Sequence, residues 1–527
     1  MSQLKKIALL FLLAIIISSC KEAIILEANL DILPVAITVK DDRFVDNFGR
    51  QVILNGVNVG SKNKEEGYIF QSGPELYAKL KAQGVNTIRF LIIWDGLEPE
   101  PGVYNEDYLK EIDKRIAWAA ANDMFVVLDM HQDLYSSKYA DGAPEWATFD
   151  ERKPHTTGAV WSDAYLMSEA VQTSFDNFWL NKPASDGIGI QDHYAALWQH
   201  IAKRYVDNKT VIGYDIMNEP FPGSEGVQSI MILLNAYSQL HYKLTGEILT
   251  EEQLGAMWMN EASRMEALEV ISTTENYDFV IRQLFDLVKE FESKNLQQMY
   301  QKVSNAIREV DTDHILFLEH SYYGNTGVAS SIERVSLADG SPDPLVAYAA
   351  HGYDLVVDTE AAALAATERV TYIFDQIAKK GKQLKMPVWV GEWGAYYNHS
   401  ESVISTAISS VNLMEQHLFG NAYWSYTNDL ENMEYFKKVL LRAYPAYTNG
   451  ELKSYRNHFE TASFTMEWEE SKTETAPTVI FIPHLSKLKP EEITTFQIEK
   501  IKDSDAGYLI VPRTKEGERR TLNLTFN

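Results

Sequence analysis

The chain has 527 residues, of which 45% are hydrophobic and 23% are charged, so it is predicted to be globular, with room for one large domain and a smaller one. Its formal net charge of −26 argues against a nucleic-acid partner, because phosphates would be repelled. The same charge disfavours binding to anionic lipid through a basic patch.

The first twenty residues are predicted to be a targeting segment. Lys5 and Lys6 precede an apolar stretch, Ile7 to Ile17, that is too short to span a bilayer. The stretch ends in Ile-Ser-Ser-Cys, which resembles the bacterial lipobox and implies cleavage before a lipid-modified Cys20. An ordinary secretory signal is the alternative. Cys20 is the sole cysteine, so no intramolecular disulfide is possible.

Residues 21–39 are predicted to be a tether, with acyl chains on Cys20 holding the protein at a membrane. We therefore expect a lipoprotein of the bacterial cell envelope, facing either the periplasm or the outside. Membrane contact is expected through this amino-terminal anchor.

From residue 40, strand-like and helix-like segments alternate, which predicts an α/β fold with a parallel sheet. Eight strand–helix units over residues 40–450 predict a (β/α)8 TIM barrel. A doubly wound open sheet is the rival, but no glycine-rich phosphate loop follows the first strand. The strand candidates are Val52–Val59, Asn86–Trp94, Met124–Asp133, Val211–Pro220, Ile315–His320, Leu345–Asp354, Pro387–Gly394 and Gly420–Thr427.

Two further segments depart from this alternation. Residues 221–298 are predicted to be a helical insertion, and its apolar run from Ile230 to Leu234 is either helix core or a wall of a groove beside the active site. Residues 459–527 contain short strands without helices, which predicts a small carboxy-terminal all-β sandwich domain.

Two strand candidates close on a glutamate: Glu219 in YDIMNEP and Glu392 in VWVGEWG. A charged side chain just past a buried strand is costly to desolvate and therefore usually has a purpose. Two carboxylates at the carboxyl ends of parallel strands could face one bond, which indicates glycoside hydrolysis. Other polar residues at predicted strand ends are Arg89, His131, Asp133, Asn218, His320, His351, Tyr353 and Trp424.

Asn-Glu-Pro at 218–220 and Gly-Glu-Trp at 391–393 resemble glycoside hydrolase family five, whose members are retaining barrels. The resemblance covers about Lys40 to Pro445. It implies that Glu219 is the acid/base and Glu392 the nucleophile. The family's recurring positions are matched by Arg89, His131, Asn218, Glu219, His351, Tyr353, Glu392 and Trp424.

The tract DMHQDLYSSKYADGAPEWA at 129–147 is similar to the endoglycoceramidases of that family, which release an intact glycan from ceramide. That resemblance implies that Lys62, Asp133 and Trp179 contact the first glucose. Asn218 would bind the sugar 2-hydroxyl, and Trp424 would offer its face to the sugar ring.

The resulting expectation is a retaining endo-acting hydrolase of the β-glucosyl–ceramide bond, with Glu392 ionised, Glu219 protonated, and a glycosphingolipid or other β-glucoside as substrate. The alternatives are an endo-β-glucanase, mannanase or β-glucosidase of the same family, and a surface lipoprotein that binds glycans without cleaving them. We expect no cofactor and no metal, because the chain has no His-x-x-x-His pair and no cysteine cluster.

Overall fold

The computed structural model describes residues 32–158, 160–357, 359, 361–397, 399–489, 496–514 and 517–527. The predicted targeting segment with Cys20, and the tether up to residue 31, lie outside these residues. None of the described helices is long and apolar enough to cross a bilayer. The last residues of the predicted tether are part of the fold instead: Ile37–Lys40 forms strand β1, and Leu33 is buried.

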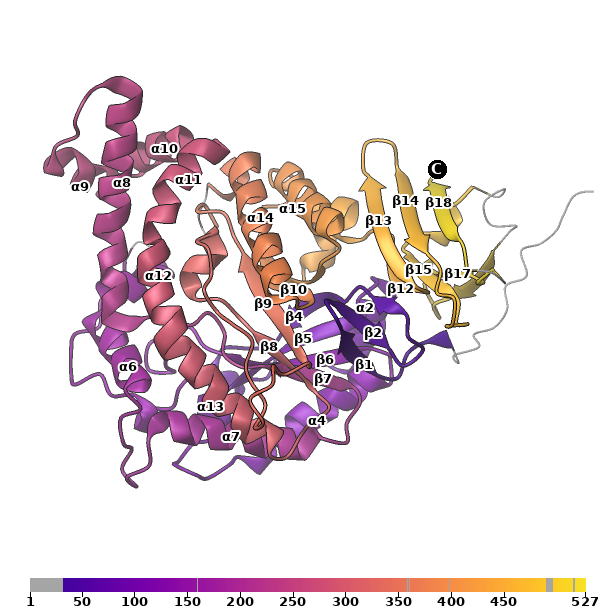
Figure 1. Ribbon diagram of the computed structural model, residues 1–527, viewed down its shortest axis with the longest axis horizontal. Helices are drawn as coiled ribbons and strands as arrows, with labels where there is room; N and C mark the ends of the chain where they lie inside the picture. The colour runs from indigo at the N-terminus through magenta and orange to yellow at the C-terminus, as the bar shows by residue number, and fades with distance from the viewer. Residues whose placement is uncertain are drawn as a thin grey trace, which may run out of the picture.

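A closed barrel of parallel strands forms the large domain, as predicted (Figure 1). Each strand candidate contains one observed barrel strand, and the last strand pairs with the first. The burial of every residue of β5, TIRFLII, explains why apolar runs marked these strands. In barrel order they are β4 (Asn55–Val59), β5 (Thr87–Ile93), β6 (Phe125–His131), β7 (Val211–Asp215), β8 (Ile315–Leu318), β9 (Val346–Gly352), β10 (Val388–Gly394) and β11 (Gly420–Trp424).

Helices surround the barrel and bury their apolar faces on it. In Glu106–Ala120 (α4), the side chain of Asn105 caps the first turn by accepting from the N–H groups of Asp107 and Tyr108, and Leu109, Ile112 and Ile116 are buried. The other long surrounding helices are α2 (Pro74–Ala82), α7 (Ile190–Tyr205), α13 (Gln297–Arg308), α14 (Thr367–Leu384) and α15 (Ile404–His417).

The segment between β7 and β8 is helical and projects from one end of the molecule, opposite the β-domain (Figure 1). Leu233 of the apolar run lines the active-site cavity, whereas Met231 is 59% exposed. The helices of this segment are α8 (Gln228–Thr245), α9 (Glu251–Met259), α10 (Glu261–Val270), α11 (Thr274–Ile281) and α12 (Phe285–Phe291).

Antiparallel sheets form the carboxy-terminal domain, but its strands begin before residue 459. The three-stranded sheet joins β13 (Glu451–His458), β14 (Ser463–Glu469) and β18 (Arg519–Thr525). The seven-stranded sheet takes in amino-terminal strands that we had assigned to the tether and barrel. Its order is β1, β2 (Arg43–Asp46), β3 (Gln51–Val52), β12 (Tyr444–Thr448), β15 (Thr478–Ile482), β17 (Gly507–Val511) and β16 (Gln497–Lys500).

The seven-stranded sheet packs on the amino-terminal end of the barrel. Phe44 of β2 stacks on Phe317 of β8 with ring centroids 6.1 Å apart. Gly84 has a φ of +84°, and a Cβ there would lie 2.5 Å from the ring of Phe481 in β15. This end of the barrel is therefore closed by the β-domain, which leaves the carboxyl ends of the barrel strands for a site.

Candidate active site

Glu219 and Glu392 meet at the carboxyl end of the barrel. Glu219 lies four residues past the end of β7, and Glu392 lies within β10. Both are buried, and an oxygen of each lies within 4.8 Å of the other and of a ring nitrogen of His351. The structure thus brings the two predicted carboxylates together at one point.

A break in the strand register positions Glu392. The pairing of β10 with β9 shifts between Val390 and Glu392, so Gly391 is an extra residue on that strand. A Cβ at Gly391 would lie 3.1 Å from Nε2 of His351, so the missing side chain allows the histidine to approach. The bulge thus directs the side chain of Glu392 into the site, where its carboxylate contacts Arg89 and Tyr353.

Glu219 is held in an unfavourable backbone conformation. Its φ is +42°, a value that costs about 1–3 kcal/mol in a residue with a Cβ. Its N–H donates to Oε2 of Glu319 at 2.8 Å, and its carbonyl accepts from Nε2 of Gln132 at 3.2 Å. These two side chains stabilise the turn that presents the carboxyl group.

Arg89 of β5 joins several acidic groups below the pair. It is fully buried, and its Nη1 donates to Oε1 of Glu392 at 2.7 Å. Its Nη2 contacts Asn218 Oδ1 at 3.0 Å and Glu319 Oε1 at 2.9 Å, and it also contacts Asn58, Asp129 and Asp215. One guanidinium cannot balance this many carboxylates, so further positive charge is required.

His351 of β9 supplies part of that charge. Its Nδ1 lies 2.9 Å from Oε1 of Glu219, and its Nε2 lies 3.2 Å from Oε1 of Glu319. Burial alone would lower the pKa of His351, but Glu319 and Glu392 raise it well above its ordinary value. A cationic His351 therefore lies between the carboxyl groups of Glu219 and Glu392.

We expected Glu392 to be ionised because Arg89 and Tyr353 favour its charged form. Both contacts are present, with the hydroxyl of Tyr353 donating to Oε2 of Glu392 at 3.0 Å. Burial nevertheless outweighs the positive charges of His351 and Arg89 and raises the pKa of Glu392 to about 7. The carboxyl group of Glu392 is therefore partly protonated at neutral pH, so the full ionisation expected from the sequence is not reached there.

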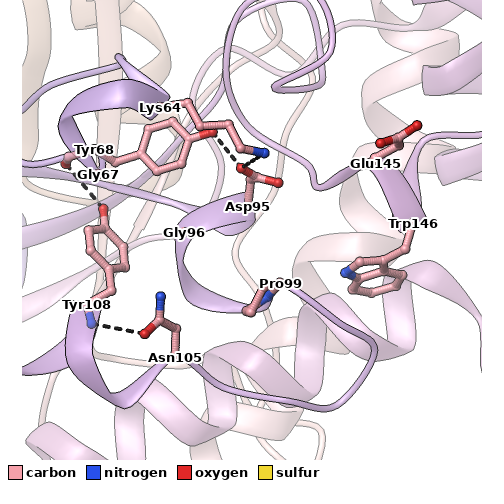
Figure 2. A pocket seen from close by; sticks show the side chains of 10 residues that line it. All are labelled: Lys64, Gly67, Tyr68, Asp95, Gly96, Pro99, Asn105, Tyr108, Glu145 and Trp146. Carbon is pink, nitrogen blue, oxygen red and sulfur yellow. Dashed lines mark hydrogen bonds and ion pairs between the residues drawn. The ribbon is translucent and has the colours of Figure 1, made fainter.

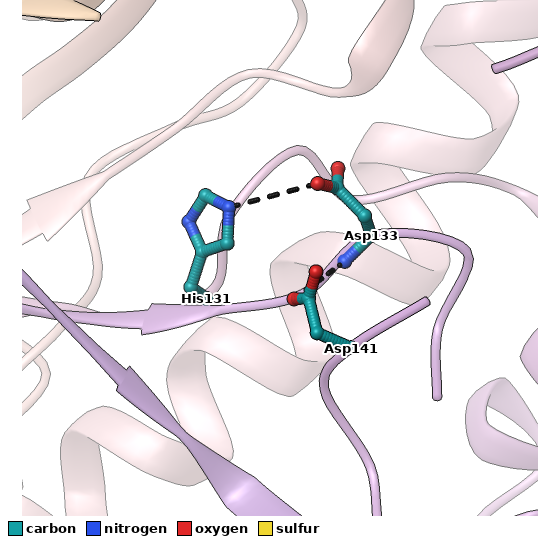
Figure 3. A group of neighbouring side chains, drawn as sticks. All are labelled: His131, Asp133 and Asp141. Carbon is teal, nitrogen blue, oxygen red and sulfur yellow. Dashed lines mark hydrogen bonds and ion pairs between the residues drawn. The ribbon is translucent and has the colours of Figure 1, made fainter. Parts of the chain in front are cut away.

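Lys62, His131, Asp133 and Trp424 form the opposite side of the site. The ammonium of Lys62 pairs with Asp133 and lies 5.2 Å from the ring centroid of Trp424, which stacks on His131 at 5.1 Å. Burial would raise the pKa of Asp133, but Lys62 and His131 lower it to about 2. Asp141 accepts from the N–H of Asp133 at 3.1 Å (Figure 3).

Among the residues that the structure describes, three groups of acidic and histidine side chains are compact enough to hold a metal ion: His131 with Asp133 and Asp141, Glu219 with His351 and Glu392, and Asp129 with Asp215 and Glu319. In each group a carboxylate already faces a protein cation, namely Lys62, His351 or Arg89. The expectation of a metal-free site stays a prediction.

Trp179 is not brought to this site. It ends helix α6 (Glu169–Trp179), where its indole N–H donates to the carbonyl of Phe221 at 2.9 Å and its ring packs edge-on against Phe291. It is absent from the side chains that line the cavity. The expected contact between Trp179 and the first glucose is therefore not supported by its position.

The cavity above the carboxylates has a volume of about 430 Å³ and two chemically different parts. One part is polar and contains the catalytic pair, Lys62, His131, Asp133, Asn218, Tyr353 and Trp424. The other part is lined mainly by aliphatic side chains from the inserted helices, from α5 (Ala164–Met167) and from the loop after β9, with Arg264 and Thr359 among them. The aliphatic side chains are Leu166, Leu233, Met265, Leu268, Ile281, Leu284, Leu355, Val356 and Val357.

A second hollow lies beside Asp95, in the loops that follow β4, β5 and β6 (Figure 2). Asp95 there accepts from the hydroxyl of Tyr68 at 2.6 Å and pairs with Lys64 at 2.7 Å. The carboxylate of Asp95 is thus satisfied by neighbours, and Glu145 is the other carboxylate among the labelled side chains. The pair of Glu219 and Glu392 lines the first cavity and not this one.

Sequence reasoning missed several polar residues of the site, of which Glu319 and Asn325 contact Glu219 directly. Glu319 directly follows β8, where we singled out the adjacent His320, and an alternating pattern could have placed Glu319 on the inner face. Asn325 donates from Nδ2 to Oε1 of Glu219 at 2.6 Å, and it lies in a short turn without periodicity.

Residues 45–430 match the family profile described as cellulase (glycosyl hydrolase family 5), and residues 442–523 match the glycoside hydrolase family 5 C-terminal domain. An endoglycoceramidase of Cyanea nozakii is 32% identical over 40% of this chain and 48% of its own length. A glucosylceramidase of Aspergillus fumigatus is 31% identical over 30% of this chain and 25% of its own length. The chain thus spans at most about half the length of these relatives.

A solved structure has the same fold over almost the whole chain. Endo-glycoceramidase II from Rhodococcus sp., in a complex with ganglioside GM3, covers 93% of this chain and 100% of its own, with a TM-score of 0.68 and 23% identity. At this identity the likeness shows the fold. The profile match, which extends over most of the chain, goes further: the protein belongs to glycosyl hydrolase family 5.

Proposed function

We propose that the protein is a retaining glycoside hydrolase that uses Glu392 as nucleophile and Glu219 as acid and base. The observation that carries this proposal is the separation of the two carboxyl groups, whose oxygens approach within 4.8 Å. Retaining enzymes place their carboxyl groups about 5–5.5 Å apart, whereas inverting enzymes leave about 6.5–9.5 Å for a water molecule.

In the first step, an oxygen of Glu392 attacks the anomeric carbon while Glu219 gives its proton to the departing oxygen. Arg89 and Tyr353 hold the two oxygens of Glu392 in place for this attack. In the second step, Glu219 takes a proton from water, and the water oxygen displaces Glu392 from the sugar. No cofactor is needed in either step.

We propose a glycosphingolipid as the substrate, with the β-glucosyl–ceramide bond as the bond that is cleaved. The cavity supports this because its polar part continues into an aliphatic part, which suits a substrate with a sugar on one side of the bond and alkyl chains on the other. Relatives named as endoglycoceramidase and glucosylceramidase agree with that division. A polysaccharide would place hydroxyl groups against aliphatic walls, where they lose their hydrogen bonds.

Endo-action would leave an intact oligosaccharide and free ceramide. Incubation with a ganglioside, lactosylceramide and a soluble β-glucan, followed by mass analysis of the products, tests this. Intact glycan plus ceramide supports the proposal. Cleavage of the glucan alone would contradict the ceramide assignment and leave a glucanase, and binding without cleavage would contradict the enzymatic assignment.

We further propose that acyl chains on Cys20 anchor the protein to a membrane of the bacterial cell envelope. The support is the order of the first twenty residues, in which Lys5 and Lys6, the apolar stretch and Ser-Ser-Cys follow one another. Labelling with a radioactive fatty acid in a bacterial host should mark the wild type and leave Cys20→Ser unlabelled. Equal labelling of both would contradict the anchor.

A further inference from the structure

Asn325 lies directly against the proposed acid/base. It belongs to the turn Tyr322–Thr326 (η8), which follows β8, and it is 6% exposed. Its Nδ2 donates to Oε1 of Glu219 at 2.6 Å. Its Oδ1 is buried and has no hydrogen-bond partner among those residues. Because buried polar atoms are normally paired, a side chain held this way calls for a functional explanation.

The turn connects Asn325 to the nucleophile's side of the site. The backbone carbonyl of Asn325 accepts from the N–H of Tyr353 at 2.8 Å, and the hydroxyl of Tyr353 donates to Glu392. The backbone of Asn325 is therefore hydrogen-bonded to Tyr353, the residue that follows β9, and this bond helps to hold the amide of Asn325 against Glu219.

The two oxygens of Glu219 have different surroundings. Oε1 contacts Nδ2 of Asn325 at 2.6 Å and Nδ1 of His351 at 2.9 Å. Within the described parts of the chain, no side-chain donor is recorded at Oε2. An oxygen that accepts two N–H groups has little capacity to carry a proton of its own, because the proton would face those donors.

We propose that Asn325 is a positioning residue which, together with His351, assigns the catalytic proton to Oε2 of Glu219. This inference rests on the proposed function, in which Glu219 is the acid/base. In the first step the proton leaves Oε2 for the glycosidic oxygen, as the bond from that oxygen to the sugar breaks and the bond from Glu392 forms. In the second step Oε2 takes a proton from water, as the water oxygen replaces Glu392 on the anomeric carbon.

A comparison of two substrates tests this assignment. Lactosylceramide needs protonation of its leaving alkoxide, whereas 2,4-dinitrophenyl β-lactoside releases a stable phenolate that needs none. In Asn325→Asp, the new carboxylate is an acceptor that faces Oε1 of Glu219, so the proton of Glu219 should move to Oε1. We expect kcat/KM to fall at least about tenfold more with lactosylceramide than with the dinitrophenyl lactoside, since acid catalysis is worth about 10²–10⁴-fold.

The pH profile supplies a second readout. A new carboxylate beside Glu219 disfavours its ionisation, so the alkaline limb of kcat/KM should move to higher pH in Asn325→Asp. Asn325→Ser, which keeps a small polar side chain, should show the same substrate contrast without that movement and serves if the aspartate variant fails to fold. Asn305→Ala is the control, since Asn305 is exposed on α13 and contacts Gln301.

Equal losses with both substrates in Asn325→Asp and Asn325→Ser would mean that Asn325 has a merely structural role, and would overturn the inference. Glu219→Gln is the reference for lost acid catalysis. If Glu219→Gln shows no dependence on the leaving group, the proposed role of Glu219 fails and this inference fails with it, which is distinguishable from failure at Asn325 alone.

Discussion

Replacing Leu268 by glutamine should weaken cleavage of ceramide glycosides and spare activated soluble glycosides. Leu268 lies on α10, is partly exposed, and lines the aliphatic part of the cavity. Burying a leucine side chain against an apolar partner contributes about 1.5–3 kcal/mol. Each 1.4 kcal/mol corresponds to about tenfold in kcat/KM, so we expect a loss of about ten- to a hundredfold with lactosylceramide.

The assay measures kcat/KM for lactosylceramide in detergent micelles and for 2,4-dinitrophenyl β-lactoside, which has no alkyl chain. Leu364→Gln is a matched control, because Leu364 is 62% exposed and is not among the residues that line the cavity. The reasoning is refuted if Leu268→Gln affects both substrates equally, or if Leu364→Gln shows the same selective loss.

Three further predictions concern the polar part. Glu319→Gln should lower the free energy of unfolding by about 2 kcal/mol, measured by urea denaturation, because the amide keeps one acceptor oxygen and either Arg89 or the N–H of Glu219 loses its partner; an unchanged midpoint would contradict this. Activity on lactosylceramide should rise as pH increases through about 7, because Glu392 attacks as the carboxylate and its pKa is about 7; a flat profile from about pH 5 to about pH 8 would contradict this. Lys62→Met should raise KM more than it lowers kcat, because the ammonium of Lys62 is expected to bind sugar hydroxyls and not to take part in the reaction. A drop confined to kcat would contradict that role.

The barrel could be predicted because its strands are buried on both faces and therefore read as short apolar runs. Each of the predicted ranges contains its strand, with ends that extend by a few residues where polar site residues continue the run, as in Val211–Pro220 for Val211–Asp215. The catalytic carboxylates were visible for the same reason, since Glu219 and Glu392 interrupt apolar sequence at the end of a strand.

Long-range pairing was not visible. Strand β3 pairs with β12, about 400 residues later in the chain, which joins β1 to β3 to the carboxy-terminal strands, and no local pattern marks such a partner. The boundaries at residues 39 and 459 were therefore drawn through a sheet. The direction of a side chain at a helix end was equally hidden. The resemblance implied that Trp179 contacts a sugar, yet at the end of α6 its ring packs against Phe291.

The supporting residues of the site depend on geometry that the sequence does not contain. Glu319 and Asn325 act on Glu219 from positions 100 and 106 residues away in the chain. Their roles follow from the φ of +42° at Glu219 and from the closeness of β7, β8 and β9, which only the folded chain reveals.

Trapping the covalent intermediate tests the catalytic pair most directly. A 2-deoxy-2-fluoro lactoside with a dinitrophenyl leaving group should add one fluorinated disaccharide to the protein, because the fluorine slows the second step more than the first. Peptide mass mapping should then place the sugar on Glu392, and Glu392→Gln should take up none. A sugar attached to Glu219, or turnover with inversion at the anomeric carbon and no adduct, would contradict the account.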